Sequence, residues 1–432
     1  MSLDVNKKSI KLDSPLTLPC GTVILNRLVK SAMTEGLASQ AGQPTESLMS
    51  LYKLWGNSGA GLLISGNIMV DRAHLERPGN VVIESRLNFS QQKNLKDWVS
   101  NGRSCGAHFF AQLNHAGRQT QKPVNRSPKA PSAVKVDLPG GQFGDPIELT
   151  ISEINEIIQR FAECAEICKE VGFTGIQIHA AHGYLISQFL SPRTNLREDE
   201  YGGSLKNRAR FLIDVYTLIR KMVGDTFPIS VKLNSADFQL GGFDFNESRQ
   251  VSIWLEDIGI DLIEISGGNY EQPKLLGTQG FEKENKQYVR QSTKCREAYF
   301  VDFAIAIKAS ISIPIMVTGG FRKRIAMQEA IDNEVSLIGI ARPMCVMHDA
   351  PKKLLLGLDE LPRFEDSLSL LPRWLSFLSK LTIIRMIALM GVQFWYYAQI
   401  VSLAEKGAAE DNLSVFTATI RTIILQSKLL KK

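Results

Sequence analysis

A short segment of the sequence places two histidines and a tyrosine within ten residues. It reads Gly175-Ile-Gln-Ile-His179-Ala-Ala-His182-Gly-Tyr184. Imidazole N–H groups can bind an oxygen atom that gains negative charge, and a phenol can supply a proton. A zinc site is one alternative, but metal-binding histidine pairs usually lie one helical turn apart, and the sequence offers no evident third ligand. A purely structural role is the other. The pattern favours an oxygen-binding imidazole pair beside a proton donor, and predicts no metal.

Eight short apolar runs recur along the chain, and His179 ends the fourth of them. Each run is typical of a strand that is buried on both faces of a parallel sheet. The eight runs are residues 28–34, 61–66, 107–113, 175–180, 228–234, 262–267, 314–319 and 337–341.

Helical patterns lie between most of these runs. Thr150-Ile-Ser-Glu153 is a capping box, and an amphipathic stretch follows over 154–171. Similar stretches cover 207–223, 247–258, 299–310 and 324–333. Alternating strands and helices predict a (β/α)8 TIM barrel, whose active site is built by the loops after the strands. The alternative is an open doubly wound sheet, but its Gly-rich phosphate turn is missing after the first run.

Composition and charge describe an ordinary globular chain with a basic tail. The 432 residues are 44% hydrophobic and 22% charged, with a net charge of +6. The six cysteines are scattered, and the polar N-terminus does not resemble a signal peptide, so we expect a reducing, cytoplasmic setting. Residues 1–355 are predicted to form the barrel and 356–432 a C-terminal helical extension.

The segment 366–432 reads as helix throughout and holds eight Lys/Arg against four Asp/Glu. Packing on the barrel, a peripheral membrane helix and an oligomer contact are the three roles open to it.

Several blocks of the chain resemble the Old Yellow Enzyme family. The longest begins at His179 and ends Ser191-Pro-Arg-Thr-Asn-Leu-Arg-Glu-Asp-Glu-Tyr-Gly-Gly-Ser-Leu-Lys-Asn-Arg-Ala-Arg-Phe211. Five further blocks are Ser31-Ala-Met-Thr34, Gln112-Leu-Asn-His-Ala-Gly-Arg118, Val231-Lys-Leu-Asn234, Thr318-Gly-Gly-Phe321 and Gly339-Ile-Ala-Arg342. The resemblance covers roughly the first 350 residues, and its blocks fall on successive strands of the expected barrel.

The resemblance implies that the barrel binds FMN. Gln112 and Lys232 match positions that serve the pyrimidine edge of the flavin, where Lys232 would stabilise the anionic reduced ring. An ion pair inside the barrel is the plainer role for Lys232. Thr34 matches the residue that hydrogen-bonds the flavin C4 carbonyl. The positions expected to line the ring with backbone atoms are Ala32, Met33 and Gly66, and those expected to hold the phosphate are Gly319, Gly320, Phe321, Ala341 and Arg342.

The same resemblance implies an ene-reductase. His179 and His182 match the pair that holds a carbonyl or nitro oxygen of the substrate, and Tyr184 matches the proton donor. NADH or NADPH would reduce the flavin directly, and the substrate would be a small molecule with an activated alkene. Many relatives have Arg where Lys232 stands, which puts the flavin potential in doubt. The alternatives are other flavin-barrel redox chemistry, such as amine or ring dehydrogenation, and a non-catalytic flavin-binding protein recruited through its basic tail. No nucleic-acid partner is expected, and a homo-oligomer is left open.

Overall fold

Eight parallel strands close into a barrel in the computed structural model of the chain. The structure describes residues 10–84, 87–138, 141–271, 300–369 and 382–430, with backbone alone for 382–389. Going round the barrel, the strands are β3 (Leu28–Lys30), β4 (Leu62–Met69), β6 (His108–Asn114), β9 (Gly175–Ala180), β10 (Ile229–Asn234), β11 (Leu262–Ser266), β12 (Ile315–Thr318) and β13 (Leu337–Ile340). Because β13 pairs with β3, the sheet has no open edge between them. The predicted barrel is confirmed, and all eight predicted runs supply its strands.

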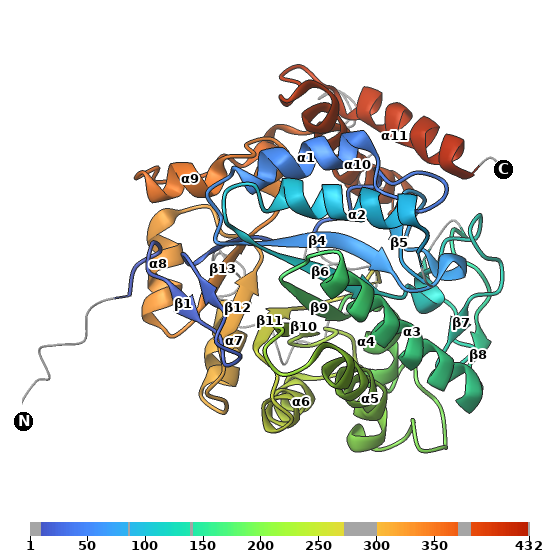
Figure 1. Cartoon of the computed structure of the whole chain (residues 1–432). Helices are drawn as coiled ribbons and strands as arrows, with labels where there is room; N and C mark the ends of the chain where they lie inside the picture. Colours follow the sequence, from blue (N-terminus) through green and yellow to red (C-terminus); the bar gives the residue numbers. More distant parts are fainter. Residues whose placement is uncertain (1–9, 85–86, 139–140, 272–299, 370–381, 431–432) are drawn as a thin grey trace, which may run out of the picture.

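Helices surround the barrel and connect successive strands (Figure 1). They are α1 (Glu46–Gly56), α2 (Phe89–Gly102), α3 (Ile151–Glu170), α4 (Leu185–Leu190), α5 (Leu205–Val223), α6 (Phe245–Asp257), α7 (Val301–Lys308), α8 (Arg324–Asp332) and α9 (Ala350–Leu355). Five of them match the predicted helices, although residue 299 of one prediction lies outside the described residues. The predicted capping box is present, because Thr150 and Glu153 each accept a hydrogen bond from the other's backbone N–H.

Further short strands lie outside the closed ring of eight. A hairpin of β1 (Leu16–Thr17) and β2 (Val23–Ile24) packs Leu18 and Ile24 against apolar residues inside the barrel, such as Leu62 and Leu262, where the strands begin. β5 (Val81–Val82) adds to the end of β4, and β7 (Lys129–Ala130) pairs with β8 (Ile147–Glu148) in the long loop after β6. The hairpin therefore fills the mouth of the barrel that lies opposite the strand C-termini.

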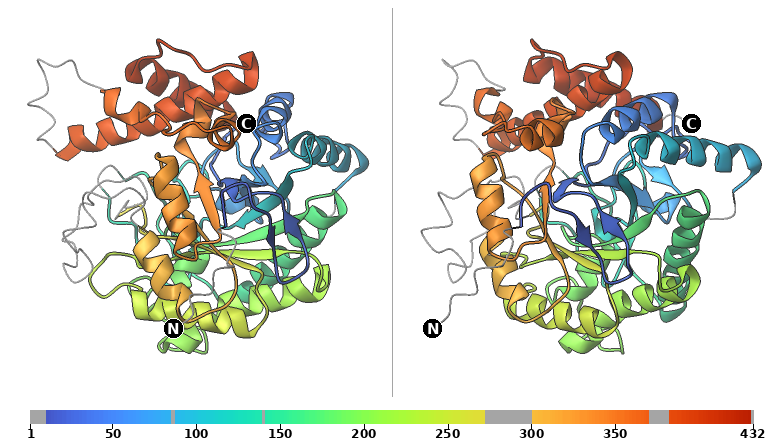
Figure 2. Two further views of the ribbon diagram at one scale, coloured as in Figure 1. Left: turned by 90° about the vertical axis from the view of Figure 1, so that its left-hand side faces the viewer. Right: turned by 60° about the vertical axis from the view of Figure 1, so that its left-hand side comes forward.

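The C-terminal segment forms two antiparallel helices beside α1. These are α10 (Thr382–Lys406) and α11 (Val415–Leu430), which lie together on one side of the molecule (Figure 2). The expectation of helix throughout is wrong for residues 368–369, which are not helical. It is also wrong for 407–414, because Gly407 ends α10 with a φ of 72°. Side chains of α10 hold this connection, since Trp395 donates to the carbonyl of Leu413 and Gln399 binds the backbone of Glu410. Residues 370–381 lie outside the described part.

Among the described helices, none is long and apolar enough to cross a membrane. The boundary between residues 355 and 356 stays a prediction.

Candidate active site

A cavity of about 440 Å³ opens where the barrel strands end. Thirteen of the fourteen residues singled out from the sequence line it, although they come from six different strands and loops. They are Ala32, Met33, Thr34, Gln112, His179, His182, Tyr184, Lys232, Gly319, Gly320, Phe321, Ala341 and Arg342. Residues that are far apart in the sequence thus meet at the C-terminal mouth of the barrel, where this fold places its active sites.

Gly66 is the one predicted residue that does not line the cavity. Its backbone N–H is directed to the side chains of Glu35, at 2.9 Å, and Tyr52, at 3.2 Å. A Cβ atom at this position would lie 2.0 Å from Glu35 Oε2, so the glycine lets the strand approach that carboxylate. The neighbouring Asn67 lines the cavity in its place.

The two histidines and the tyrosine form one cluster. The ring centroids of His179 and His182 are 5.0 Å apart, and those of His179 and Tyr184 are 4.8 Å apart. His182 has a φ of 61°, an uncommon backbone state for a residue other than glycine. Its backbone N–H donates to Asn234 Oδ1 at 3.1 Å, and this bond helps to hold the turn that directs the ring into the cavity.

Both imidazoles are held neutral. Burial lowers the pKa of His179 and of His182 well below the usual value, and the charge of Lys232 adds to the effect. His179 Nδ1 accepts the N–H of Ala181 at 3.2 Å, so the ring proton belongs on Nε2. His182 Nε2 lies 2.7 Å from Ser266 Oγ. Neutral rings can still donate an N–H group to a substrate oxygen, without the desolvation cost of a buried imidazolium.

A row of polar side chains crosses four neighbouring strands below the histidines. Gln112 on β6 donates to Gln177 on β9 at 2.7 Å, and Gln177 donates to Glu264 on β11 at 2.8 Å. Lys232 Nζ on β10 lies 2.8 Å from Glu264 Oε1. Lys232 therefore makes the ion pair that the sequence offered as its plainer role, and it also lines the cavity. Its ammonium is fixed in place by the carboxylate, as an immobile charge facing the cavity.

Two arginines and a glutamate stand at the other end of the cavity. Gly319 and Gly320 follow β12 with φ values of 136° and 79°, which bring the backbone close to the cavity. Arg342 Nη1 lies 3.1 Å from Glu365 Oε1, and Arg322 Nη2 lies 2.7 Å from the same oxygen. Arg322 and Glu365 are additions to the residues singled out from the sequence.

The cavity fits the flavin cofactor by the chemistry of its lining. Within the described part of the chain, Asn67 Oδ1 and Arg322 Nε are buried without a hydrogen-bond partner, and both residues line the cavity. Such atoms are costly unless a ligand satisfies them. Backbone glycines with two guanidinium groups suit a phosphate at one end, and the Gln112–Lys232 edge suits the polar side of an isoalloxazine ring.

Helix α10 supplies a wall of the cavity that the sequence analysis missed. Val392, Gln393, Tyr396, Tyr397 and Ile400 all line it. Tyr396 donates to Glu365 Oε2 at 2.7 Å, so the helix is tied to the arginine end of the cavity. No motif marks these residues, because nothing in the local sequence indicates that the tail returns to the mouth of the barrel.

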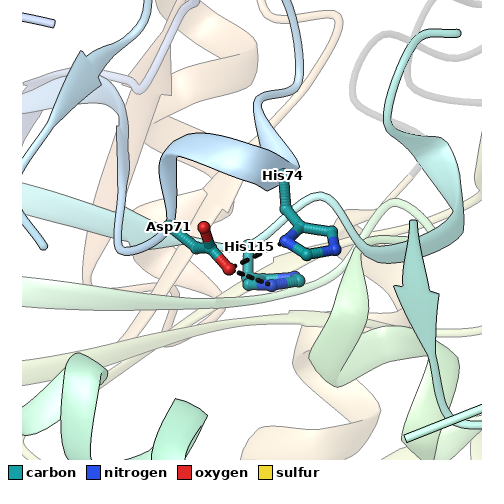
Figure 3. A group of neighbouring side chains, drawn as sticks. All are labelled: Asp71, His74 and His115. Carbon is teal, nitrogen blue, oxygen red and sulfur yellow. Dashed lines mark hydrogen bonds and ion pairs between the residues drawn. The ribbon is translucent and has the colours of Figure 1, made fainter. Parts of the chain in front are cut away.

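A second cluster of buried histidines lies outside the cavity lining. Asp71, His74 and His115 meet between the loops after β4 and β6 (Figure 3). His74 Nδ1 is 2.8 Å from Asp71 Oδ2, and His74 Nε2 accepts the N–H of Lys129. The ring proton is therefore on Nδ1, the nitrogen that would have to be free to bind a metal ion. Arg160 Nη1 also lies 3.3 Å from the same carboxylate oxygen, so charge is already balanced there.

This cluster and its neighbour Arg118 hold loops together. Burial lowers the pKa of His115 to about 4. Burial acts to raise the pKa of Asp71, but the neighbouring imidazoles of His115 and His74 keep it well below its usual value. Arg118 pairs with Glu271 and donates to the carbonyl of Lys135 at 2.6 Å. These contacts join the long loop after β6 to the loops after β4 and β11.

A parallel barrel whose C-terminal mouth has a phosphate-suited end and a polar edge suited to an isoalloxazine ring fits the class of flavin-dependent oxidoreductases. The sequence model of the NADH:flavin oxidoreductase / NADH oxidase family matches residues 11–360. The chain therefore belongs to this family, the Old Yellow Enzyme group. It is an FMN-dependent oxidoreductase that uses NADH or NADPH as its hydride donor.

Characterised relatives agree with this placement. The NADH-dependent flavin oxidoreductase iliE of Hypocrea jecorina is 36% identical over 364 residues, which cover 79% of this chain and 88% of the relative. The NADH oxidase of Thermoanaerobacter brockii is 34% identical over 77% of this chain and 48% of its own length. A 2-naphthoyl-CoA reductase bound to 2-naphthoyl-CoA has a TM-score of 0.72 at 25% identity, over 80% of this chain and 52% of that one. An old yellow enzyme homologue from Zymomonas mobilis shares the fold, with a TM-score of 0.67 at 24% identity over 82% of this chain and 95% of that one.

Proposed function

We propose that the enzyme reduces activated C=C bonds of small molecules, such as enones and nitroalkenes. The observation that carries the proposal is the convergence of His179, His182 and Tyr184 on one cavity that Lys232 also lines. FMN, when bound, supplies the redox chemistry, by accepting a hydride from NADH or NADPH and passing it to the substrate. The chain's own residues bind the substrate, polarise it and supply the proton.

The histidine pair holds the substrate oxygen. His179 offers its Nε2 proton, and His182 stands beside it at the same face of the cavity. Two N–H donors aimed at a carbonyl or nitro oxygen stabilise the negative charge that grows there when a hydride reaches the β-carbon. Because the rings are neutral and buried, they do so without water competing for the oxygen.

Tyr184 donates the proton to the α-carbon. Burial raises the pKa of this phenol well above its usual value, with a further contribution from the charge of Glu76. The hydroxyl therefore stays protonated throughout the neutral range and is ready to act as a general acid.

The proposal is tested by substituting the proton donor and the pair separately. We expect Tyr184→Phe to lower turnover of cyclohexenone by about 10²-fold or more, while reduction of the bound flavin by NADH keeps its rate. We expect the His179→Ala, His182→Ala double variant to abolish the long-wavelength absorbance band that a bound phenol gives with oxidised flavin. Unchanged enone turnover in Tyr184→Phe, together with intact phenol binding by the double variant, would refute the proposal.

A further inference from the structure

A second tyrosine and a buried glutamate lie directly behind Tyr184. The hydroxyl oxygens of Tyr184 and Tyr270 are 2.8 Å apart, and the Tyr270 hydroxyl lies 3.4 Å from Glu76 Oε1. All three residues line the cavity. The second distance is longer than an ordinary hydrogen bond, as catalytic contacts often are before a substrate is bound. The three side chains form a line that leads away from the histidine pair.

Both partners of Tyr184 are held by their own loops. Glu76 follows β4, where Asn80 Nδ2 donates to Glu76 Oε2 at 3.3 Å and Asn80 Oδ1 accepts the N–H of Arg77 at 2.9 Å. Tyr270 follows β11 between two anchored residues. Asn269 donates to Gln239 Oε1 at 2.6 Å, and Glu271 is paired with Arg118. The Glu76 carboxyl and the backbone that carries Tyr270 are thus held by contacts that do not involve Tyr184.

The surroundings of the line favour neutral, protonated groups. Tyr184 packs in an apolar cluster with Met69, Val82 and Ala116, and Tyr270 packs against that cluster. Burial raises the pKa of Tyr270 well above its usual value, so a phenolate left at either tyrosine is unfavourable.

The same holds for the carboxyl group. Burial also raises the pKa of Glu76, against the charge of Arg77 and hydrogen bonds from Asn80, Thr34 and Tyr270, which lower it. Besides Arg77, the titratable groups near Glu76 are the phenols of Tyr184, Tyr270 and Tyr397. A buried carboxyl of this kind retains its proton closer to neutral pH than an exposed one.

We propose that Glu76 and Tyr270 form a proton relay that restores the proton of Tyr184 during each reduction. The inference rests on the proposed role of Tyr184 as the donor to the α-carbon. When the Tyr184 O–H bond breaks and a C–H bond forms at the α-carbon, the Tyr270 proton moves to the Tyr184 oxygen. The Glu76 proton then moves to the Tyr270 oxygen, and a hydronium ion from the solvent that reaches the cavity returns a proton to the Glu76 carboxylate and leaves as water. The net change is one hydride and one solvent proton added across the C=C bond.

Two substrates separate this relay from a structural role. An enone needs a proton at carbon before the product can leave, because its enolate is strongly basic. A nitroalkene gives a stable nitronate anion after hydride transfer, which can leave and be protonated in water. The relay should therefore matter for the first substrate and not for the second.

The variants are Tyr270→Phe and Glu76→Gln, with Tyr216→Phe as a matched control. Tyr216 is a buried tyrosine on α5 whose hydroxyl donates to the carbonyl of Ile258, away from the cavity. Each holoenzyme is checked for FMN content by absorbance. The holoenzyme is then reduced and mixed with one of the two substrates, and the rate of flavin reoxidation is measured. We expect both relay variants to slow enone reduction on the order of tenfold or more and to keep nitroalkene reduction within about twofold of the wild-type rate. The Tyr216→Phe control should keep both rates.

A pH profile gives a second readout. Wild-type enone reduction should fall as rising pH removes the proton of Glu76, and Glu76→Gln should lose that fall. Equal slowing of both substrates in the relay variants would overturn the relay and leave a structural role. The relay would also be overturned if Tyr184→Phe reduced the enone slowly but both relay variants reduced it as fast as the Tyr216→Phe control. If Tyr184→Phe itself kept the wild-type enone rate, the proposed function would fail, and the relay with it.

Discussion

Burial controls the charge of three histidines, the His179–His182 pair of the cavity and His115 outside it. His179 and His182 are neutral because they are enclosed and because Lys232 lies near them, which suits donors to a substrate oxygen. His115 is enclosed as well, and its ring stacks on that of His74 with the centroids 4.2 Å apart. The nearby Asp71 carboxylate favours the protonated ring but does not outweigh burial, so the pKa of His115 is lowered to about 4.

His115 should make folding sensitive to mild acid. The unfolded chain protonates this imidazole near its ordinary value of 6.5, whereas the folded protein does so only at about 4. The stability contributed by neutral His115 is thus present above pH 6.5 and is lost as pH falls toward 4, by about 1.4 kcal/mol per pH unit and about 3 kcal/mol in all. Urea unfolding of wild type and His115→Gln between pH 8 and 4.5 measures this. The free energies of unfolding of the two proteins should change with pH at the same rate near pH 8 and should diverge below pH 6.5. Parallel changes over the whole range would contradict the expectation.

Local sequence signals define the elements that present the site. Helix α3 precedes the catalytic strand β9, and its first turn is closed by the reciprocal bonds of Thr150 and Glu153. Its buried face, which includes Ile154 and Phe161, packs in the main core. The helix therefore begins at a fixed residue and helps to set the position of the strand that carries His179.

Removal of the cap should destabilise the protein without changing the site. We expect Thr150→Ala to lower the free energy of unfolding by about 0.5–2 kcal/mol, because a backbone N–H at the helix start loses its acceptor. The exposed Ser152 in the same turn provides the control, since Ser152→Ala removes a hydroxyl that does not cap the helix. Chemical denaturation of both variants measures the difference, and equal stabilities would show that the capping box contributes nothing here.

At the scale of the whole molecule, the cavity joins parts of the chain that are separated by more than 300 residues. Thr34 follows the first barrel strand, Arg342 follows the last, and Tyr396 comes from the tail. A cofactor bound in this cavity would contact several of these parts at once, so its binding energy adds directly to the stability of the fold.

FMN should stabilise the folded protein more than riboflavin does, because its phosphate adds contacts at the arginine end of the cavity. At a free concentration one hundred times its dissociation constant, a ligand of the folded state contributes about 2.7 kcal/mol. We expect Arg342→Met to weaken FMN binding by about tenfold and to leave riboflavin binding nearly unchanged, because only FMN carries the phosphate. Arg324→Met, at an exposed position on α8, controls for the loss of one positive charge. Thermal melts and fluorescence titrations with both flavins provide the measurement, and equal losses for the two flavins would rule out a phosphate contact at Arg342.

Much of the fold and part of the site could be predicted from the sequence, since the relevant signals are local. Apolar runs predicted the eight strands, and the strand-end position of His179 placed it at the mouth of a closed barrel. The family resemblance placed Lys232 and Gly319 at the same mouth. Gly66 was expected to line the flavin ring, but its backbone N–H is directed to Glu35 and Tyr52 instead. The local sequence does not reveal these two contacts.

Only the tertiary structure decided which loops and which part of the tail complete the cavity. Glu76 and Tyr270 are ordinary residues in their own segments, and they become partners of Tyr184 when β4, β9 and β11 take their places in one barrel. Tyr396 lines the site because α10 packs beside α1. Periodicity and capping act over a few residues and can be read along the chain, whereas these contacts depend on barrel closure and helix docking, which bring distant residues together.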